Sequence, residues 1–242
     1  MEYKYIAGSS FGKDSIATIL TALKYKEPLD AVLYCEVMFD EEISGEVPEH
    51  RDFIYNTAIP WVESQGIPVF AVKSERTYLD VFYQKIQKSS NPALIGKCVG
   101  FPLSGRCHIQ GRCKVRSLER YMRKRLPNVM VQYVGISEDE PFRLQRLKPG
   151  KISLLAKYGI GKEEAFGISR AAGLLSPVYD FARRSGCWFC PNASEQELAH
   201  LREQHPKLWK RLLKLGAEDT ATARFNRTYT VFELEERLRK KH

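Results

Sequence analysis

The sequence predicts an α/β protein built on a parallel sheet, because apolar runs typical of strands alternate with amphipathic runs typical of helices. The strands are expected at residues 3–7, 31–39, 68–72 and 129–136. Helical segments between successive strands give a doubly wound, Rossmann-like sheet with helices on both faces. From residue 162 onward the pattern is helical. We therefore expect an α/β domain over residues 1–160 and a helical, cysteine-bearing region over residues 161–242.

The helices are expected from apolar spacing and from residues typical of helix ends. After the first strand, Ile16, Ile19, Leu20 and Leu23 fall at the spacing of one buried helix face. Pro48 suits the first turn of a second helix, which should end near Gly66. Residues 88–112 are rich in glycine, proline and serine and are expected to form a long irregular loop. Further helices are expected at 78–87, 114–125, 163–172, 194–204, 206–215 and 231–239.

The stretch from Ser9 to Ser15, S-S-F-G-K-D-S, joins the first expected strand to the first expected helix. Glycine lets backbone approach a ligand closely, and the first turn of a helix presents free N–H groups to an anion. The spacing fits neither the Walker phosphate loop nor the G-x-G-x-x-G dinucleotide loop. An anion, most naturally a nucleotide phosphate, is the expected ligand.

The side chains of this stretch suit a phosphate group and a cation. Lys13 can neutralise phosphate charge, and the hydroxyls of Ser10 and Ser15 can donate hydrogen bonds. Asp14 favours a polyphosphate only if a cation lies between them, which implies Mg²⁺. The alternative is an ordinary strand-to-helix turn in which Asp14 and Ser15 are helix-start residues.

A second candidate stretch, Gly135 to Arg143, follows the fourth expected strand. Ligands of open α/β sheets bind at the carboxyl ends of strands, so this stretch and the loop around Gly12 are expected at the same edge. Arg143 would then serve as a second phosphate or sulfate clamp. A helix start with acidic residues in its first turn is the alternative.

The formal net charge is +9, and much of the basic character lies in residues 106–125. Such a block suits partners that carry phosphate, either a nucleotide or a nucleic acid, although a solvated helix face would have the same composition. No apolar stretch is long enough to cross a bilayer and no signal-peptide core is seen at Met1–Lys4, so a cytoplasmic protein without membrane contact is expected.

Six cysteines in a chain expected in reducing surroundings are read first as metal or redox chemistry. Cys187 and Cys190 form a C-x-x-C knuckle, and Cys107 with Cys113 is the expected second pair. Four thiolates could hold a [4Fe-4S] cluster or a structural Zn²⁺, and the spacing does not decide between them. A thioredoxin-type redox pair is the rival reading. Cys98 and His108 are alternative ligands, and Cys35 is expected to be a plain buried cysteine.

Three segments together resemble the phosphoadenosine phosphosulfate (PAPS) reductase family in its broad sense, which includes sulfurtransferases. The first, S-F-G-K-D-S, is similar to the S-G-G-x-D-S loop of the PP-loop ATP pyrophosphatases, with Phe11 in place of the first glycine. The others are Gly135–Arg143 and the run from Gly173 to Asn192. The resemblance implies an adenine-nucleotide α hydrolase (HUP-type) fold with a five-stranded parallel sheet. No cysteine follows Cys190, so the C-terminal nucleophile of the true reductases is missing, and the sulfurtransferase-like branch fits better.

The resemblance implies an enzyme that uses ATP and Mg²⁺, adenylates an acceptor and lets sulfur displace AMP. The expected nucleotide-binding residues are Ser10, Phe11, Gly12, Lys13, Asp14, Ser15, Gly135 and Arg143, of which Lys13, Asp14 and Arg143 are catalytic. Expected partners are an adenine nucleotide, a nucleic-acid or nucleotide acceptor, and a cysteine desulfurase as sulfur donor. A sulfonucleotide reductase with an external thiol donor and a nucleotide-responsive nucleic-acid-binding module are the alternatives.

Overall fold

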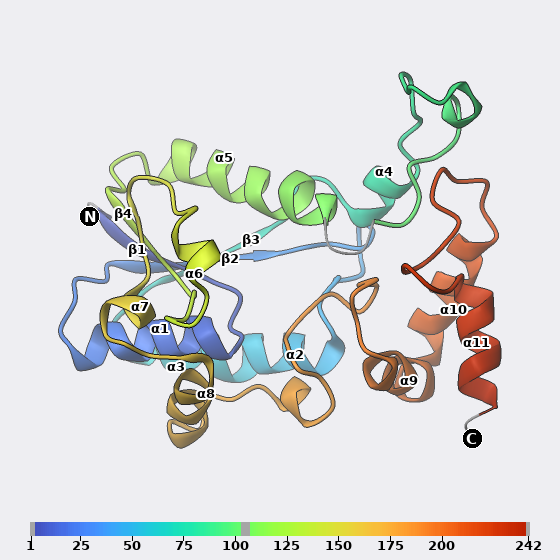
Figure 1. Ribbon diagram of the computed structural model, residues 1–242. Helices are drawn as coiled ribbons and strands as arrows, with labels where there is room; N and C mark the ends of the chain where they lie inside the picture. The colour runs from blue at the N-terminus through green and yellow to red at the C-terminus, as the bar shows by residue number, and fades with distance from the viewer. Residues whose placement is uncertain (1–2, 103–106, 241–242) are drawn as a thin grey trace. The chain divides into compact units, whose positions relative to one another are not determined.

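The computed structural model describes residues 3–102 and 107–240 (Figure 1). The chain divides into two compact units, each assembled from separate stretches of sequence. The first comprises residues up to Glu36, Pro48–Lys73 and Ser117–Ser185. The second comprises Val37–Val47, Ser74–Arg116 and residues from Gly186 onward. The division into domains at residue 160 stays a prediction.

The first unit contains a five-stranded, all-parallel sheet in the order β3-β2-β1-β4-β5. The order reverses beside β1, which is where open α/β sheets bind ligands. The Rossmann-like α/β fold expected from the sequence is therefore confirmed, including a fifth strand. The strands are β1 (Tyr5–Ser9), β2 (Ala31–Glu36), β3 (Val69–Lys73), β4 (Val131–Val134) and β5 (Lys151–Ile152).

Helices cover both faces of this sheet because the central strands carry apolar side chains on both faces, as in β2, where every residue is buried. On one face, Ala7 and Val32 pack with Ile16 of α1 (Lys13–Lys24) and with the segment that follows α2. On the other face, Ile6 and its neighbours pack against α5 (Arg116–Arg125), and Figure 1 shows α5 on the side of the sheet opposite α1. The segment after α2 (Pro48–Phe53) continues as a π-helix, Ile54–Ala58, and then as α3 (Ile59–Ser64).

Shorter elements complete the first unit. The apolar residues Leu155, Ile160 and Ala165 pack on Ala17 of α1 and hold two helices against it. These helices are α7 (Leu154–Lys157) and α8 (Lys162–Ala171), and the remaining elements are α6 (Pro141–Leu144) and a 3-10 turn at Pro177–Asp180.

The second unit has its own core, rich in aromatic residues, in which Phe39, Tyr78, Trp188, Phe189 and Trp209 are buried. Its elements are α4 (Tyr78–Phe82), a 3-10 turn (Pro92–Leu94), a π-helix (Gln110–Val115), α9 (Glu195–Gln204), α10 (Pro206–Gly216) and α11 (Val231–Arg239). The three C-terminal helices lie within one residue of where the sequence predicts them. Among the described residues, no helix combines the length and apolar content needed to cross a membrane.

One helix is shorter than predicted: residues 83–87 do not continue α4. The backbone of residues 84–86 pairs with residues 97–99 instead, through Ile86 N–H to Lys97 O at 3.0 Å and Val99 N–H to Gln84 O at 2.9 Å. These non-local hydrogen bonds outweigh the helical pattern of the segment. They also give part of the expected 88–112 loop a fixed partner.

Candidate functional site

The loop between β1 and α1 stands at the carboxyl end of the central strand, next to the point where the strand order reverses. Gly12 precedes the first residue of α1 and has extended backbone, and no side chain caps the helix there. Its carbonyl accepts the N–H groups of Ser15 and Ile16, both at 3.0 Å. The loop therefore leads directly into a helix N-terminus, which favours an anion.

Phe11 occupies the left-handed region of backbone space, with φ of +54°. Glycine adopts this conformation without strain, whereas other residues lose roughly 1–2 kcal/mol. The ring of Phe11 is fully buried and packs edge-on against Tyr34, with ring centroids 5.6 Å apart. Burial of the ring offsets the strain, so the loop keeps the turn that a glycine would make.

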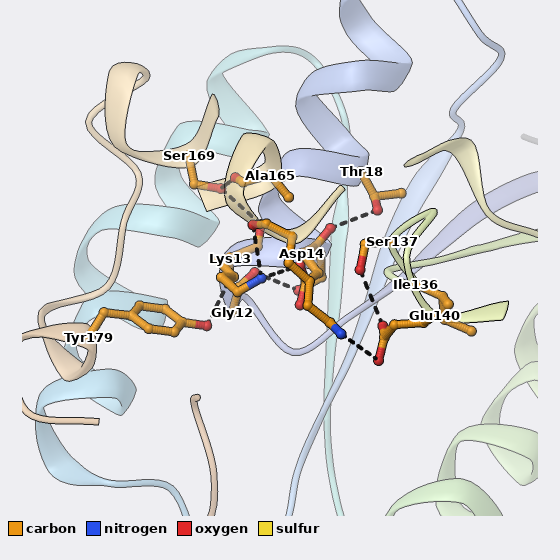
Figure 2. A network of polar contacts seen from close by, with 12 residues as sticks. Gly12, Lys13, Asp14, Thr18, Ile136, Ser137, Glu140, Ala165, Ser169 and Tyr179 are labelled. Atoms are coloured by element: carbon orange, nitrogen blue, oxygen red, sulfur yellow. Dashed lines mark hydrogen bonds and ion pairs between the residues drawn. The ribbon is translucent and has the colours of Figure 1, made fainter. Parts of the chain in front are cut away.

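Lys13 and Asp14, the two charged residues of the loop, bind each other through Nζ and Oδ1 at 2.6 Å (Figure 2). The Lys13 ammonium also donates to the backbone carbonyl of Lys162 at 3.3 Å. Their side chains are 15% and 29% exposed, so solvent reaches both. A polyphosphate with a bound cation would offer each of them a partner of opposite charge.

The two serines hold the shape of the loop. Ser15 Oγ accepts from Ser10 N–H at 3.3 Å and donates to the Gly12 carbonyl at 3.0 Å. The Ser15 hydroxyl proton is therefore engaged within the loop. The Ser10 carbonyl oxygen lies 3.0 Å from Nε2 of His50, which is fully buried. The other ring nitrogen of His50, Nδ1, lies 2.9 Å from Ser176 Oγ.

Tyr179 and Ser185 cover Gly12, a role that was not predicted from the sequence. The Tyr179 hydroxyl accepts a hydrogen bond from Lys13 N–H at 2.9 Å, and burial raises the pKa of this tyrosine. A Cβ added at Gly12 would lie 3.0 Å from Tyr179 Oη and closer still to Ser185 Oγ. Any side chain at position 12 would therefore displace this cover.

Gly135 is brought to the loop, as predicted from the order of the strands. A Cβ at Gly135 would lie 2.9 Å from the carbonyl carbon of Asp14 and 2.9 Å from Ser15 N, both of them backbone atoms. Only glycine lets β4 end so close to the start of α1. Gly135 thus acts by allowing close packing, whatever ligand the loop binds.

Arg143 is more than half exposed and binds the carboxylate of Glu140 at 2.7 Å. Burial acts to raise the pKa of Glu140, but the hydrogen bonds and charge of Arg143, with help from Lys162, keep it below its usual value. The Glu140 carboxylate also accepts from Ser137 Oγ at 3.4 Å (Figure 2). Arg143 is therefore held in a polar network that includes Lys162, whose carbonyl accepts from Lys13.

The four candidate metal ligands all lie in the second unit. Cys187 and Cys190 form a tight turn, in which Cys190 N–H donates to the Cys187 carbonyl at 3.0 Å. Trp188 anchors this turn by donating from its backbone to Gly45 O at 3.0 Å and from Nε1 to Ser44 O at 2.8 Å. Burial raises the pKa of Cys187, and the charges of Glu46, Cys190 and Cys107 add to this while Lys114 opposes it.

Cys113 is placed differently from the other three. It is fully buried at the π-helix before α5, and its thiol lies 3.6 Å from the Thr77 carbonyl oxygen. Burial raises the pKa of this thiol to about 11. Arg76 and Arg112 act on Cys113 from nearby, whereas Arg106 lies outside the described residues.

The spacing of the sulfur atoms bears on which metal they suit. Four thiolates around one Zn²⁺ lie about 3.8 Å apart, because each bond of the tetrahedron is about 2.3 Å long. Among the described residues, no three cysteine sulfurs lie within 4.8 Å of one another. A cluster that places each thiolate on a separate iron accommodates wider spacing.

Two buried polar atoms beside these cysteines, Tyr78 Oη and His108 Nε2, have no hydrogen-bond partner in the part of the chain that the structure describes. Burial is the main reason that the pKa of His108 is lowered, and the positive charge of Arg112 lowers it further. The other two cysteines have structural surroundings. Cys35 is buried within β2, and Cys98 is buried in the bridge that it forms with Lys85.

The sequence matches no family model and no curated protein. Among solved structures, the chain is similar to the U34-tRNA thiolase NcsA from Methanococcus maripaludis with its [4Fe-4S] cluster. The sequence identity is 19%, the TM-score is 0.46, and the match covers 98% of this chain and 81% of the thiolase chain. At this level of similarity, the function has to be argued from the residues of this chain.

Proposed function

We propose that this chain is an ATP pyrophosphatase-type enzyme of the PP-loop superfamily, which adenylates an acceptor and transfers sulfur to it. The supporting observation is the loop from Ser10 to Ser15, which opens α1 at the reversal of the strand order and has a glycine whose added Cβ would meet Ser185 and Tyr179. Helix N-termini at this point of an α/β sheet suit nucleotide phosphates.

In this proposal the loop binds ATP through its pyrophosphate. The backbone around Gly12 and the hydroxyl of Ser10 contact the phosphate oxygens, and Lys13 leaves Asp14 to neutralise charge that develops on them. Asp14 would hold Mg²⁺, which would screen the negative charge of the phosphates. Arg143, released from Glu140, clamps the remaining phosphate. Attack of an acceptor oxygen at the α-phosphorus expels pyrophosphate and leaves an adenylate.

The metal centre in the proposal is held by Cys107, Cys113, Cys187 and Cys190. An iron-sulfur cluster bound there would supply or activate the sulfur that displaces AMP from the adenylate. The neighbouring cations Arg76, Arg112 and Lys114 offset the negative charge of several thiolates, as their effects on the cysteines indicate. A structural Zn²⁺ is the alternative. The acceptor is proposed to be a nucleic acid or nucleotide, and the sulfur donor a cysteine desulfurase.

Nucleotide binding tests the first half of the proposal. Lys13→Met is compared with Lys24→Met, which removes an exposed lysine at the other end of α1. We expect calorimetry with Mg-ATP to show at least about tenfold weaker binding for Lys13→Met, because charge-assisted contacts are worth roughly 1.5–3 kcal/mol. Lys24→Met should bind as the unaltered protein does. Equal affinities for all three proteins would contradict the phosphate role of Lys13.

Metal analysis after anaerobic purification tests the second half. The proposal predicts a coloured protein with about four iron and four sulfide per chain. Colourless protein with one equivalent of zinc would instead assign the cysteines a structural role, leaving the nucleotide half standing.

A further inference from the structure

Tyr78 lies in the second unit at the start of α4, and its position is fixed from two directions. A reciprocal capping box between Thr77 and Asp80 sets the first turn of the helix. The ring packs against Phe189 and Phe39, with centroids 4.1 and 5.4 Å away. The hydroxyl therefore points where the backbone and the aromatic core direct it, with little freedom to seek another partner.

The hydroxyl of Tyr78 is fully buried and has no hydrogen-bond partner among residues 3–102 and 107–240. A buried phenol normally finds a partner, because leaving its polar group unsatisfied costs roughly 1–3 kcal/mol. Buried polar groups without a hydrogen-bond partner are rare in native proteins, and each calls for an explanation, such as a bound ligand. The phenol is a donor as well as an acceptor, so an electron-rich group is a suitable partner.

The place of Tyr78 in the fold points to a cysteine-bound group as that partner, because its ring packs against Phe189, which lies between Cys187 and Cys190, with ring centroids 4.1 Å apart. Burial is the main reason that the pKa of Tyr78 is raised, and the next contributions come from Cys107, Cys187 and Cys190. Three of the four proposed ligands therefore act electrostatically on a hydroxyl that has no partner among the described residues. A negatively charged sulfur atom accepts hydrogen bonds. Metal-bound ligands are commonly hydrogen-bonded by side chains that do not themselves contact the metal.

We propose that the Tyr78 hydroxyl donates a hydrogen bond to a sulfur atom of the cysteine-bound metal centre. The inference rests on the metal centre of the proposed function but not on its nucleotide chemistry. Tyr78 is a positioning residue in this role: it stabilises negative charge on the sulfur and fixes the orientation of the ligand turn. Removing the donor should weaken metal retention and make a bound cluster harder to reduce, because hydrogen bonds to sulfur tune cluster potential.

Tyr78→Phe tests the inference, with Tyr83→Phe as the matched control. Tyr83 follows the same helix, and its hydroxyl already has a partner, because it donates to Glu218 at 3.0 Å. Each protein is compared metal-free and after anaerobic loading with iron(II) and sulfide. The measurements are the urea midpoint of unfolding, the rate of iron loss to a chelator and the midpoint potential of the cluster.

Metal-free Tyr78→Phe should unfold at the same or higher urea than the unaltered protein, because the variant has no unsatisfied hydroxyl. After loading, the order should reverse, with iron lost about tenfold faster and the midpoint potential more negative. Tyr83→Phe should match the unaltered protein in iron loss and potential. An equal loss of stability in both states would mean a purely structural tyrosine and overturn the inference, as would unchanged iron loss and potential.

The failure of the inference is distinguishable from failure of the metal centre itself. If the unaltered chain takes up no iron and sulfide, the cluster half of the proposed function falls and the inference falls with it. If the unaltered chain loads normally and Tyr78→Phe behaves identically, only the inference falls. Mg-ATP binding, measured on the same samples, reports separately on the loop.

Discussion

The Tyr179 hydroxyl accepts a hydrogen bond from the backbone N–H of Lys13 at 2.9 Å, across 166 residues of sequence. Lys13 is the first residue of α1, so Tyr179 satisfies one of the N–H groups that a helix start leaves free. Ser169 acts on the same residue from α8, donating from Oγ to the Lys13 carbonyl at 2.8 Å. The backbone N–H and the backbone carbonyl of Lys13 are therefore both hydrogen-bonded to side chains from the C-terminal half of the first unit.

Tyr179→Phe should loosen the loop. The substitution removes the acceptor of Lys13 N–H and the hydrogen bonds of the hydroxyl with Ser185, and leaves the ring in place. We therefore expect the unfolding free energy to fall by about 1 kcal/mol. Saturating Mg-ATP should shrink this difference, because a phosphate oxygen can take the place of the hydroxyl. Urea unfolding with and without nucleotide measures both effects. Tyr229→Phe, which removes an exposed hydroxyl bound to Arg237, serves as the control. A nucleotide-independent difference would argue against phosphate binding at Lys13 N–H.

Gly12→Ala should disrupt the loop, whereas Gly167→Ala should not. The new methyl at position 12 would meet Ser185 and Tyr179, while a methyl at position 167 of α8 meets nothing within 4 Å. We expect Gly12→Ala to abolish measurable Mg-ATP binding and to lower the unfolding midpoint. Gly167→Ala should raise stability by up to about 1 kcal/mol, because alanine favours helix over glycine. Normal nucleotide affinity in Gly12→Ala would show that the loop accommodates a methyl group at position 12 and would contradict this prediction.

Phe11→Gly should be more stable than Phe11→Ala, the reverse of the usual ranking of these two residues. Both variants lose the buried ring, which costs roughly 3–5 kcal/mol. Glycine relieves the backbone strain of a φ of +54°, which is worth about 1 kcal/mol, whereas alanine keeps it. Chemical denaturation of the two variants measures the difference directly. If Phe11→Ala proved the more stable, the loop would not hold position 11 in the left-handed conformation.

Glu235→Gln should destabilise the second unit at neutral pH and much less in acid. Burial acts to raise the pKa of Glu235, but hydrogen bonds from Arg202, Arg239 and Trp209 leave it below the usual 4.5. A carboxylate with a lowered folded-state pKa stabilises the fold above the unfolded-state pKa, and this contribution is lost as pH falls through the folded-state value. We expect a deficit of about 1–3 kcal/mol at pH 7.

The measurement for Glu235 is urea unfolding at pH 7 and near pH 3, with Glu236→Gln as an exposed control on the same helix. The Glu235→Gln deficit should shrink in acid, where the native side chain also becomes neutral. A deficit that is the same at both pH values would mean that charge on Glu235 contributes nothing.

The sequence predicted the local parts of the site because each part has a local cause. Gly12 and Gly135 were predicted as nucleotide-binding residues, which stays a prediction, and an added Cβ at either position would meet neighbouring residues. Ile16 and Ile19 form a buried helix face at the expected spacing, while Leu23 at its end is 36% exposed. The position of Gly135 beside the first loop followed from a general property of parallel sheets.

What the sequence could not predict are the contacts made between distant segments. Nothing in the local pattern links His50 to Ser10 and Ser176, or Tyr179 to Lys13, because each pair depends on the folded path of the whole unit. The early end of α4 has the same origin, since pairing of residues 84–86 with 97–99 replaces helical hydrogen bonds. The roles of Lys13, Asp14, Arg143 and the four cysteines stay predictions.

The identity of the nucleotide products tests the central claim most directly. The chain, loaded anaerobically with iron and sulfide, is incubated with α-labelled and γ-labelled ATP, Mg²⁺, a sulfur donor and either bulk RNA or DNA as acceptor. Cleavage at the α-phosphate predicts labelled AMP or adenylate from the first label and pyrophosphate from the second, with neither formed by Lys13→Met. ADP and inorganic phosphate, with no AMP whatever the acceptor, would contradict the account.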